Sequence, residues 1–189
     1  MKPRDVTRIA LFGTESTGKT WLAERLAQGF DEPWSREFAR EFWDRHEGII
    51  TAADLDAIGR GQIANEEAGA AAAKRVVFCD TELITCTLWN DALFPGACPT
   101  WVRQQAEERA RQFSLYLLCD ADVPFVPDPQ RCFPDEASRE RARVIWRDAL
   151  VSRSLPTVVI RGDWAERERS AFAAVEEILV RAGKRDGKV

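Results

Sequence analysis

The chain has 189 residues, of which 45% are hydrophobic and 31% are charged, and its formal net charge at pH 7 is −4. This length predicts one domain with a well-buried core, and the acidic balance lacks the basic footprint that nucleic-acid binding usually needs. No apolar run approaches the roughly 20 residues that span a bilayer, and the N-terminus has no secretory pattern. We therefore expect a cytoplasmic protein that binds neither nucleic acid nor membranes; whether it is a homo-oligomer stays open.

The first part of the chain predicts two strands, each followed by a helix. The apolar run Ile9–Phe12 does not alternate with polar residues, which is typical of a buried parallel strand. An amphipathic helix opens at Lys19, a short strand is expected near Trp34, and a second helix should run from Ser35 to about His46. No serine or cysteine site around His46 suggests a catalytic triad, so we expect this histidine in the last turn of that helix or at the surface.

The middle of the chain continues the alternation. Thr51 and Asp54 have the spacing of a capping box, which predicts the start of a long alanine-rich helix that ends near Lys74. A strand over Val76–Cys79 and a helix over Leu83–Asp91 follow. The five cysteines are scattered without a C-x-x-C pair, so a zinc site and a disulfide framework are both poor interpretations. Those in strands, Cys79 and Cys119, are expected to be buried, reduced thiols.

The last part of the chain contains an irregular segment, Asp120–Asp135, whose prolines and lack of periodicity predict a surface loop. We expect Gly183 to stop the last helix. The remaining predicted elements are helices over Thr100–Phe113, Asp135–Ser152 and Asp163–Ala182, and strands over Leu115–Cys119 and Thr157–Ile160.

This alternation of strands and helices predicts an α/β fold. We expect a three-layer P-loop NTPase fold with a mostly parallel central sheet of about five strands flanked by helices. No composition break divides the chain, so residues 1–183 are expected to form a single kinase domain with a lid at about 120–147. The tail 184–189 is expected to be flexible.

The sequence Gly13-Thr-Glu-Ser-Thr-Gly18-Lys19-Thr20 satisfies the pattern G-x-x-x-x-G-K-[ST], and it lies between a predicted strand and a predicted helix, as a P-loop requires. Its glycines let the backbone N–H groups point at phosphate oxygens, and the lysine supplies a positive charge for the β- and γ-phosphates. The alternative is an ordinary glycine-rich turn. The residues expected to bind ATP here are Gly13, Glu15, Ser16, Thr17, Gly18, Lys19 and Thr20.

A P-loop protein needs a second anchor for Mg²⁺, usually an acidic residue at the end of a neighbouring strand. Asp80 follows the apolar run that ends at Cys79, so Thr20 and Asp80 are the expected Mg²⁺ ligands. The structural alternative for Asp80 is a cap for the helix that begins near Leu83, and one residue can serve both roles.

Other motifs in the sequence, present or missing, indicate the class of P-loop protein. A guanine-reading Asn/Thr-Lys-x-Asp motif after a strand is missing, as is a transporter signature, whereas a charged lid is present. Arg131 lies in the irregular segment, and Arg139 and Arg143 share a face of the next predicted helix; such arginines neutralise charge on a transferring phosphoryl group. Pairing with glutamates on the same helix is the alternative for Arg139 and Arg143.

The acceptor side is indicated by Arg36, Glu37 and Arg40. On a helix the two arginines would share a face beside the carboxylate, and together these groups could hold ribose hydroxyls. The carboxylate that accepts the proton of the acceptor could be Glu37 or Asp80. An exposed ladder of charges is the alternative.

Taken in order, these segments resemble the nicotinamide riboside kinase domain at the C-terminal end of bacterial NadR proteins. The resemblance covers most of the chain, although only the P-loop is specific when taken alone. Here Phe38 replaces a tyrosine of that family, and Pro129-Gln130 replaces a glycine-bearing turn. The segments that carry it are Gly13–Thr20, Glu37-Phe38-Ala39-Arg40, Gly61-Gln62, Asp80-Thr81 with Thr85, and Asp122–Asp128 leading to Arg131.

The resemblance implies ATP- and Mg²⁺-dependent phosphorylation of the 5′-hydroxyl of nicotinamide riboside, a step of NAD salvage. The larger relatives carry further domains ahead of the kinase, and because this chain starts at the first kinase strand, we do not expect their adenylyl-transfer or repressor roles here. Two rivals remain: a kinase of another nucleoside or nucleotide, and a nucleotide-sensing regulatory ATPase. By resemblance, Lys19, Thr20, Asp80 and Arg131 would handle ATP and metal, Glu37, Arg40, Asp80 and Thr81 would face the nucleoside, and Trp89 or Trp43 could stack on its ring.

Overall fold

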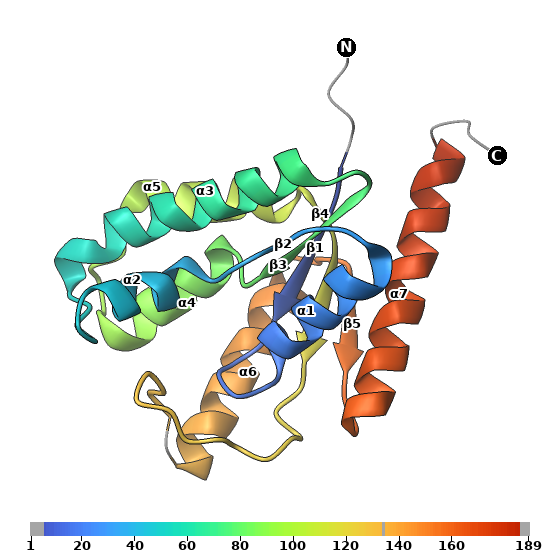
Figure 1. Ribbon diagram of the computed structural model, residues 1–189. Helices are drawn as coiled ribbons and strands as arrows, with labels where there is room; N and C mark the ends of the chain where they lie inside the picture. The colour runs from blue at the N-terminus through green and yellow to red at the C-terminus, as the bar shows by residue number, and fades with distance from the viewer. Residues whose placement is uncertain (1–5, 134, 186–189) are drawn as a thin grey trace.

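A parallel five-stranded sheet is the centre of the computed structural model, which describes residues 6–133 and 135–185 (Figure 1). Its strand order is β2-β3-β1-β4-β5, and every neighbouring pair is parallel. This confirms the predicted fold class. The strands are β1 (Thr7–Phe12), β2 (Trp34–Ser35), β3 (Val76–Asp80), β4 (Phe113–Cys119) and β5 (Thr157–Ile160).

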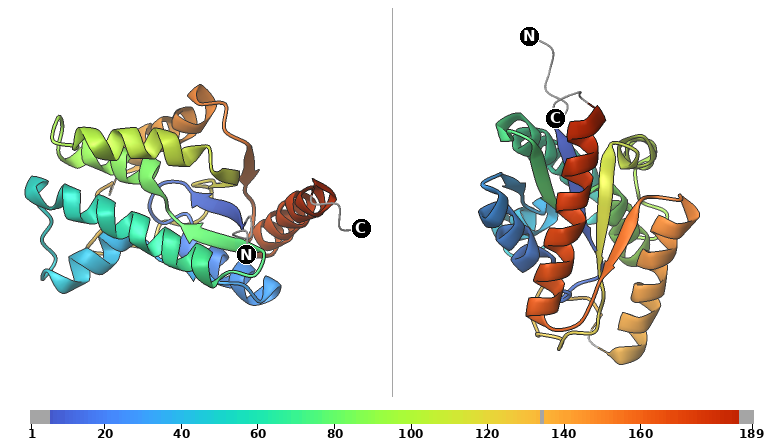
Figure 2. Two further views of the ribbon diagram at one scale, coloured as in Figure 1. Left: turned by 90° about the horizontal axis from the view of Figure 1, so that it is seen from above. Right: turned by 90° about the vertical axis from the view of Figure 1, so that its right-hand side faces the viewer.

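Helices cover both faces of this sheet and form the outer two layers (Figures 1 and 2). One face is covered by α1 and α7, and the other by α3, α4, α5 and α6. The helices are α1 (Lys19–Phe30), α2 (Phe38–Arg45), α3 (Leu55–Ala72), α4 (Leu83–Leu93), α5 (Thr100–Ala110), α6 (Glu136–Ser152) and α7 (Trp164–Arg185), with a 3₁₀ turn at Ala52–Asp54.

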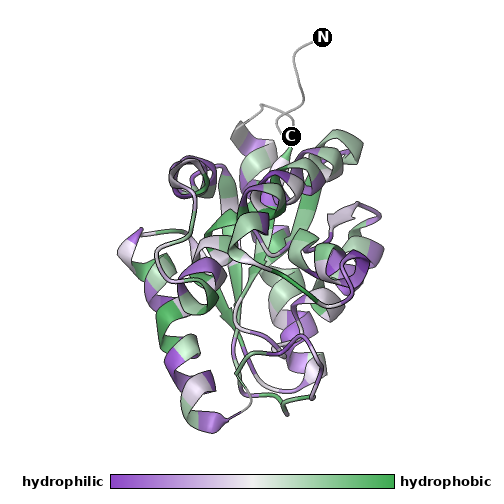
Figure 3. Cartoon of the chain, turned by 90° about the vertical axis from the view of Figure 1, so that its left-hand side faces the viewer, coloured by the Kyte–Doolittle hydropathy of each residue, from purple (hydrophilic) through white to green (hydrophobic). Residues whose placement is uncertain are grey.

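The strands are hydrophobic on both sides because both faces of the sheet are covered (Figure 3). Successive side chains of a strand point to opposite faces. Within β1, Ala10 and Phe12 therefore pack under α4, α5 and α6, whereas Ile9 and Leu11 pack under α1 and α7. The predicted buried cysteines of β3 and β4 are indeed buried, as free thiols.

Three predicted boundaries were wrong. Ser35 pairs with β3 instead of opening a helix, so α2 begins only at Phe38. Phe113 pairs with β1, which ends α5 early, at Ala110. Helix α7 continues through Gly183 to Arg185, because this glycine does not adopt the left-handed conformation that stops a helix.

The structure also describes the ends of several helices. The capping box of Thr51 and Asp54 is confirmed, and it opens the 3₁₀ turn that leads into α3. His46 caps the end of α2 at the surface, with its ring stacked on Phe42. Of the predicted tail, 184 and 185 belong to α7 and 186–189 lie outside the described residues. No helix in the described part of the chain has the length and apolarity to cross a bilayer.

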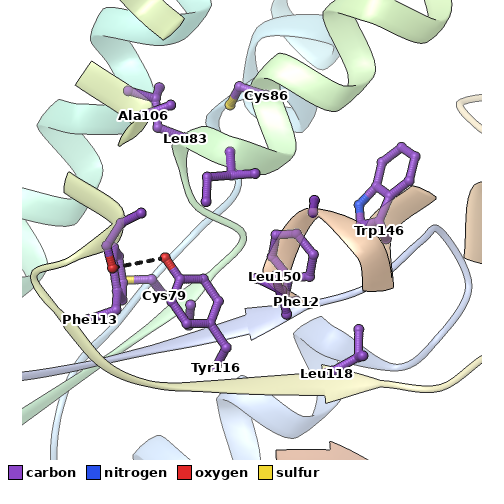
Figure 4. Close-up of a cluster of buried hydrophobic side chains, with 14 of the residues drawn as sticks. Phe12, Cys79, Leu83, Cys86, Ala106, Phe113, Tyr116, Leu118, Trp146 and Leu150 are labelled. Atoms are coloured by element: carbon purple, nitrogen blue, oxygen red, sulfur yellow. Dashed lines mark hydrogen bonds between the residues drawn. The ribbon is translucent and has the colours of Figure 1, made fainter. Parts of the chain in front are cut away.

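The cluster under α6 allows a matched test of the core (Figure 4). Leu150 is 1% exposed within it, whereas Val151, the next residue of α6, is 68% exposed. Leu150→Ala should lower the free energy of unfolding by about 2–5 kcal/mol, because it leaves a cavity. Val151→Ala should change it by less than about 0.5 kcal/mol. Urea denaturation of both variants measures the difference, and equal losses would contradict this description of the core.

Candidate active site

The P-loop lies between the end of β1 and the start of α1, as the sequence predicted. Gly13 and Gly18 have φ angles of +142° and +80°, and a Cβ on Gly13 would lie 2.6 Å from the carbonyl oxygen of Cys119. Both positions therefore need glycine. The Lys19 ammonium group donates a hydrogen bond to the Thr14 carbonyl oxygen at 2.7 Å, so it is held at the mouth of the loop. The backbone and charge together form an anion cradle at a helix N-terminus.

Asp80 ends β3 directly beside this cradle. The Thr20 hydroxyl donates a hydrogen bond to Asp80 Oδ2 at 2.5 Å, while Asp80 Oδ1 is buried and has no hydrogen-bond partner among the described residues. Burial raises the pKa of the Asp80 carboxyl, although the positive charge of Lys19 opposes this shift. The cap of α4 is Glu82, whose carboxylate accepts from the N–H groups of Ile84 and Thr85, so the capping role considered for Asp80 was wrong.

The pair of Thr20 and Asp80 fits Mg²⁺. A hydroxyl and a carboxylate with an unused oxygen are hard oxygen ligands of the kind Mg²⁺ prefers. The described residues contain no group of three or more His, Cys, Asp or Glu side chains that could hold a metal ion. The other ligands would therefore have to come from nucleotide phosphates and water, which is usual for Mg²⁺ in phosphotransferases.

A cavity of about 450 Å³ opens in front of the P-loop. Part of its wall is apolar and includes Leu55, Ile58 and Phe94. It brings most of the predicted site residues together: Glu15, Ser16, Thr17, Gly18, Lys19, Thr20, Glu37, Arg40, Trp89 and Arg131.

Three predicted site residues lie outside the lining of this cavity. Gly13 lines a separate, smaller hollow of about 140 Å³. Asp80 is 2% exposed and reaches the site through Thr20. Thr81 is fully buried, with a left-handed φ of +76° and a hydroxyl without a hydrogen-bond partner in the described part of the chain.

Glu37 is the one acidic side chain of α2 and its approach that lines the cavity. It stands just before α2 in extended conformation. Burial raises its pKa to about 7, with Lys19 opposing the shift and Asp80 adding to it. A carboxyl group with this pKa can accept a proton near neutral pH.

Arg40 also lines the cavity, but its guanidinium group is already paired. It binds Asp128 of the irregular segment at 2.6 Å, and this bond raises the pKa of Arg40. Arg36 lies over the ring of Trp34, 5.2 Å from its centre. The expectation that Arg36 and Arg40 share a helix face was wrong, because Arg36 precedes α2.

The irregular segment is tied to the P-loop. The Glu15 carboxylate accepts hydrogen bonds from the N–H groups of Cys132 and Phe133 at 2.9 and 2.7 Å, and the Ser16 hydroxyl accepts from the N–H of Val126 at 2.8 Å. The sequence motif indicated phosphate contacts for Glu15 and Ser16 and gave no signal for these bonds, which join residues more than 100 positions apart.

The bonds to Glu15 place Arg131 in the cavity wall. Its Nε and Nη1 are buried and have no hydrogen-bond partner among the residues described, and its guanidinium lies 5.4 Å from the centre of the Phe125 ring. Arg139 lies over the same ring, at 4.6 Å. Arg143 is bound to Glu140 on its own helix, which is the kind of pairing that the alternative named, and also to Asp120 at 2.6 Å, which was not predicted.

Trp89 and Trp43 both line the cavity. Trp89 stacks on Phe133 with ring centres 5.1 Å apart and contacts Trp146 with its edge. One face of Trp89 is thus covered by the irregular segment. Trp43 packs beside Gly48.

Sequence reasoning missed Arg167 of α7. This arginine is 1% exposed, and its guanidinium donates to the carbonyl oxygens of Thr17, Asp120 and Gly162, which braces the P-loop from behind. It lies in the run Glu166-Arg167-Glu168-Arg169, whose alternating charges predict an exposed helix surface. The sequence therefore carries no signal for the burial of Arg167.

A second hollow of about 490 Å³ also adjoins the P-loop. Its lining includes Glu15 and Ser16, which it shares with the first cavity, and also Asp120, Phe125 and Arg139. Two spaces therefore adjoin the same P-loop residues, Glu15 and Ser16.

Comparison with known proteins agrees with this arrangement. A protein family described as an AAA domain matches residues 8–167. The trifunctional NAD biosynthesis/regulator protein NadR of Salmonella typhimurium is 24% identical over 188 residues, which is 97% of this chain and 45% of that protein. The chain thus spans about half the length of the curated relatives it matches.

Solved structures of NadR proteins share the fold. A NadR protein in complex with NR superposes with a TM-score of 0.70 at 24% identity, covering 94% of this chain and 52% of that one. One in complex with NAD and AMP-PNP gives 0.69 at 23% identity, covering 92% and 49%. The resemblance to NadR proteins that the motifs predicted is confirmed.

Proposed function

The chain belongs to a family of AAA domains, and on this premise we propose that it is an ATP- and Mg²⁺-dependent kinase that phosphorylates the 5′-hydroxyl of nicotinamide riboside. The observation that carries the proposal is the pair of spaces that share Glu15 and Ser16 of the P-loop. A kinase needs two substrates to meet at one phosphoryl group, and one of these spaces holds Glu37, a carboxyl with a pKa of about 7.

In this proposal the P-loop binds the ATP phosphates through its backbone N–H groups and Lys19. Thr20 and Asp80 would hold Mg²⁺, which when bound would supply positive charge to neutralise the phosphates. Glu37 accepts the proton of the acceptor hydroxyl, whose oxygen bonds to the γ-phosphorus while the bond to the leaving ADP breaks. Arg131 donates its free N–H groups to the transferring phosphoryl oxygens.

The acceptor is proposed from the character of the cavity and from the relatives. Trp89 and Trp43 offer rings to a cationic aromatic ring, which such faces attract. The NadR protein in complex with NR shares the fold. A nucleoside is favoured over a nucleoside monophosphate because Arg40, one of the few cationic side chains in the wall, is already paired with Asp128.

An acceptor panel tests the substrate. ADP release would be followed with nicotinamide riboside, nicotinic acid riboside, the common nucleosides and their monophosphates, each with Mg·ATP. We expect nicotinamide riboside to give the highest kcat/KM. Rapid turnover of another acceptor with none of nicotinamide riboside would reject this substrate but keep the kinase.

A further inference from the structure

Gln62 lies in the middle of α3, is completely buried and does not line the acceptor cavity. Its Oε1 accepts a hydrogen bond from the N–H of Phe38 at 3.0 Å, and its Nε2 donates to the carbonyl oxygen of Thr81 at 3.2 Å. Nε2 also lies 3.4 Å from Oε1 of Glu66. Only one orientation of the amide serves both backbone partners, because an N–H needs the oxygen and a carbonyl needs the NH₂ group.

The two backbone partners of Gln62 are the immediate neighbours of the two carboxylates at the site. Phe38 follows Glu37 and is the first residue of α2, and Thr81 follows Asp80, the last residue of β3. These segments are far apart in sequence, and Gln62 joins their main chains through one side chain. Thr81 has a φ of +76°, a conformation that a β-branched residue adopts only when its surroundings hold it there.

The surface of α3 is shaped to receive this segment. A Cβ on Gly61 would lie 2.2–2.3 Å from ring atoms of Phe38, so the absence of a side chain at position 61 lets the Phe38 ring come against the helix. Asn65, almost one turn further along α3, donates to the carbonyl oxygen of Arg36 at 3.1 Å. The backbone on both sides of Glu37 is thus bound to α3.

We propose that Gln62 is a positioning residue that sets the separation between Glu37, which lines the acceptor cavity, and Asp80, which ends β3. The inference rests on the kinase function proposed above, since it assigns Gln62 a part in placing the proton acceptor and the metal ligand. Without this bridge the Glu37 segment would be free to move away from β3. A displacement of about 1 Å at a catalytic group can cost about 10²-fold in rate.

The titration of Glu37 reports on the same geometry. The charged groups that act on Glu37 are Lys19 and Glu15 of the P-loop, Asp80 of β3 and Arg40 of α2. If the segment moves outward, Glu37 becomes better solvated and lies farther from Asp80. Moving away from Lys19 would raise the pKa and moving away from Asp80 would lower it, but burial is the largest cause of the shift, so the pKa should fall from about 7 towards the ordinary value of 4.5.

Gln62→Met keeps the size of the side chain but removes its hydrogen bonds. We expect kcat to fall about 10–100-fold, the KM for ATP to stay unchanged because the P-loop is not altered, and the acid limb of kcat/KM to move to lower pH. Gln62→Glu keeps the acceptor for the Phe38 N–H, loses the donor to Thr81 and faces Glu66. It should show the same changes and serves as the second variant should Gln62→Met fail to fold.

Tyr116→Phe is the matched control, because it removes one buried hydrogen bond, from the Tyr116 hydroxyl to the Ala110 carbonyl oxygen, away from the site. It should lower stability without changing kcat or the pH profile. Gln62 variants that lose stability to the same extent while keeping the wild-type kcat and acid limb would overturn the proposal.

A readout without turnover separates this inference from the function on which it rests. The Glu37 carboxyl can be titrated by ¹³C NMR, with its resonance assigned by its loss in Glu37→Gln. A wild-type protein that phosphorylates no acceptor would reject the kinase function. The Gln62 bridge would still be supported by a lower Glu37 pKa in Gln62→Met, and overturned by an unchanged one.

Discussion

Asp80→Asn is expected to reduce kcat about 10³-fold, because several kcal/mol of transition-state stabilisation depend on the metal ion that Asp80 would hold. Asparagine keeps an oxygen that accepts from the Thr20 hydroxyl, so the local structure should persist. What is lost is the negative charge and the second carboxylate oxygen. Steady-state kinetics at saturating Mg·ATP measure the effect.

Stability separates this loss of activity from unfolding. The pKa of Asp80 is raised in the folded protein, so ionisation of this carboxyl disfavours folding, and the penalty grows as pH rises above the unfolded pKa. Asp80→Asn should therefore unfold at a temperature no lower than wild type at pH 8. Asp31→Asn, at an exposed carboxylate bound to Lys74, is the matched control and should keep the wild-type kcat. An Asp80→Asn variant with the wild-type kcat would remove Asp80 from the metal site.

Glu37→Gln is expected to reduce kcat about 10²–10⁴-fold, the usual contribution of a general base. In the wild type, kcat/KM should fall as pH drops below about 7, because Glu37 then becomes protonated and cannot accept the acceptor proton. The variant should lack this limb. Glu41→Gln, one turn along α2 at a carboxylate bound to Arg45, is the matched control and should behave as wild type.

Although Glu37→Gln should lower activity, it should raise the stability of the folded protein. The Glu37 pKa rises from 4.5 to about 7 on folding, so the folded protein holds a proton that the unfolded chain releases between these values. The stability of the wild type therefore falls as pH rises from about 4.5 to about 7. Glu37→Gln should be more stable than wild type at pH 8 and equal to it below pH 4.5, as urea denaturation would measure. A variant with full activity would assign the proton transfer elsewhere, with Asp80 the next candidate.

The P-loop and Asp80 could be predicted from sequence because short local motifs identify them. Lys19 and Thr20 follow a fixed spacing, and Asp80 ends an apolar run that is typical of a buried strand; in the structure this strand pairs with β1. The fold followed for the same reason, since unbroken apolar runs between helices need a sheet covered on both faces.

The connections between distant segments could not be predicted. The pairing of Arg40 with Asp128 joins residues 88 positions apart, and the bonds of Glu15 to Cys132 and Phe133 span still more. No local pattern encodes such contacts, because each partner is an ordinary polar residue in its own segment. The start of α2 was misplaced for a related reason, since the pairing of Ser35 with Cys79 overrides the helical pattern of the charges that follow.

The most direct test of the proposed reaction is ³¹P NMR of the protein with Mg·ATP and nicotinamide riboside. If the phosphoryl group is transferred to the 5′-hydroxyl, a phosphomonoester signal coupled to the 5′-methylene protons should grow as fast as the ADP signal, and inorganic phosphate should remain low. The contrary result is release of inorganic phosphate alone, at a rate that does not depend on the nucleoside, which would make the protein a nucleotide-hydrolysing sensor.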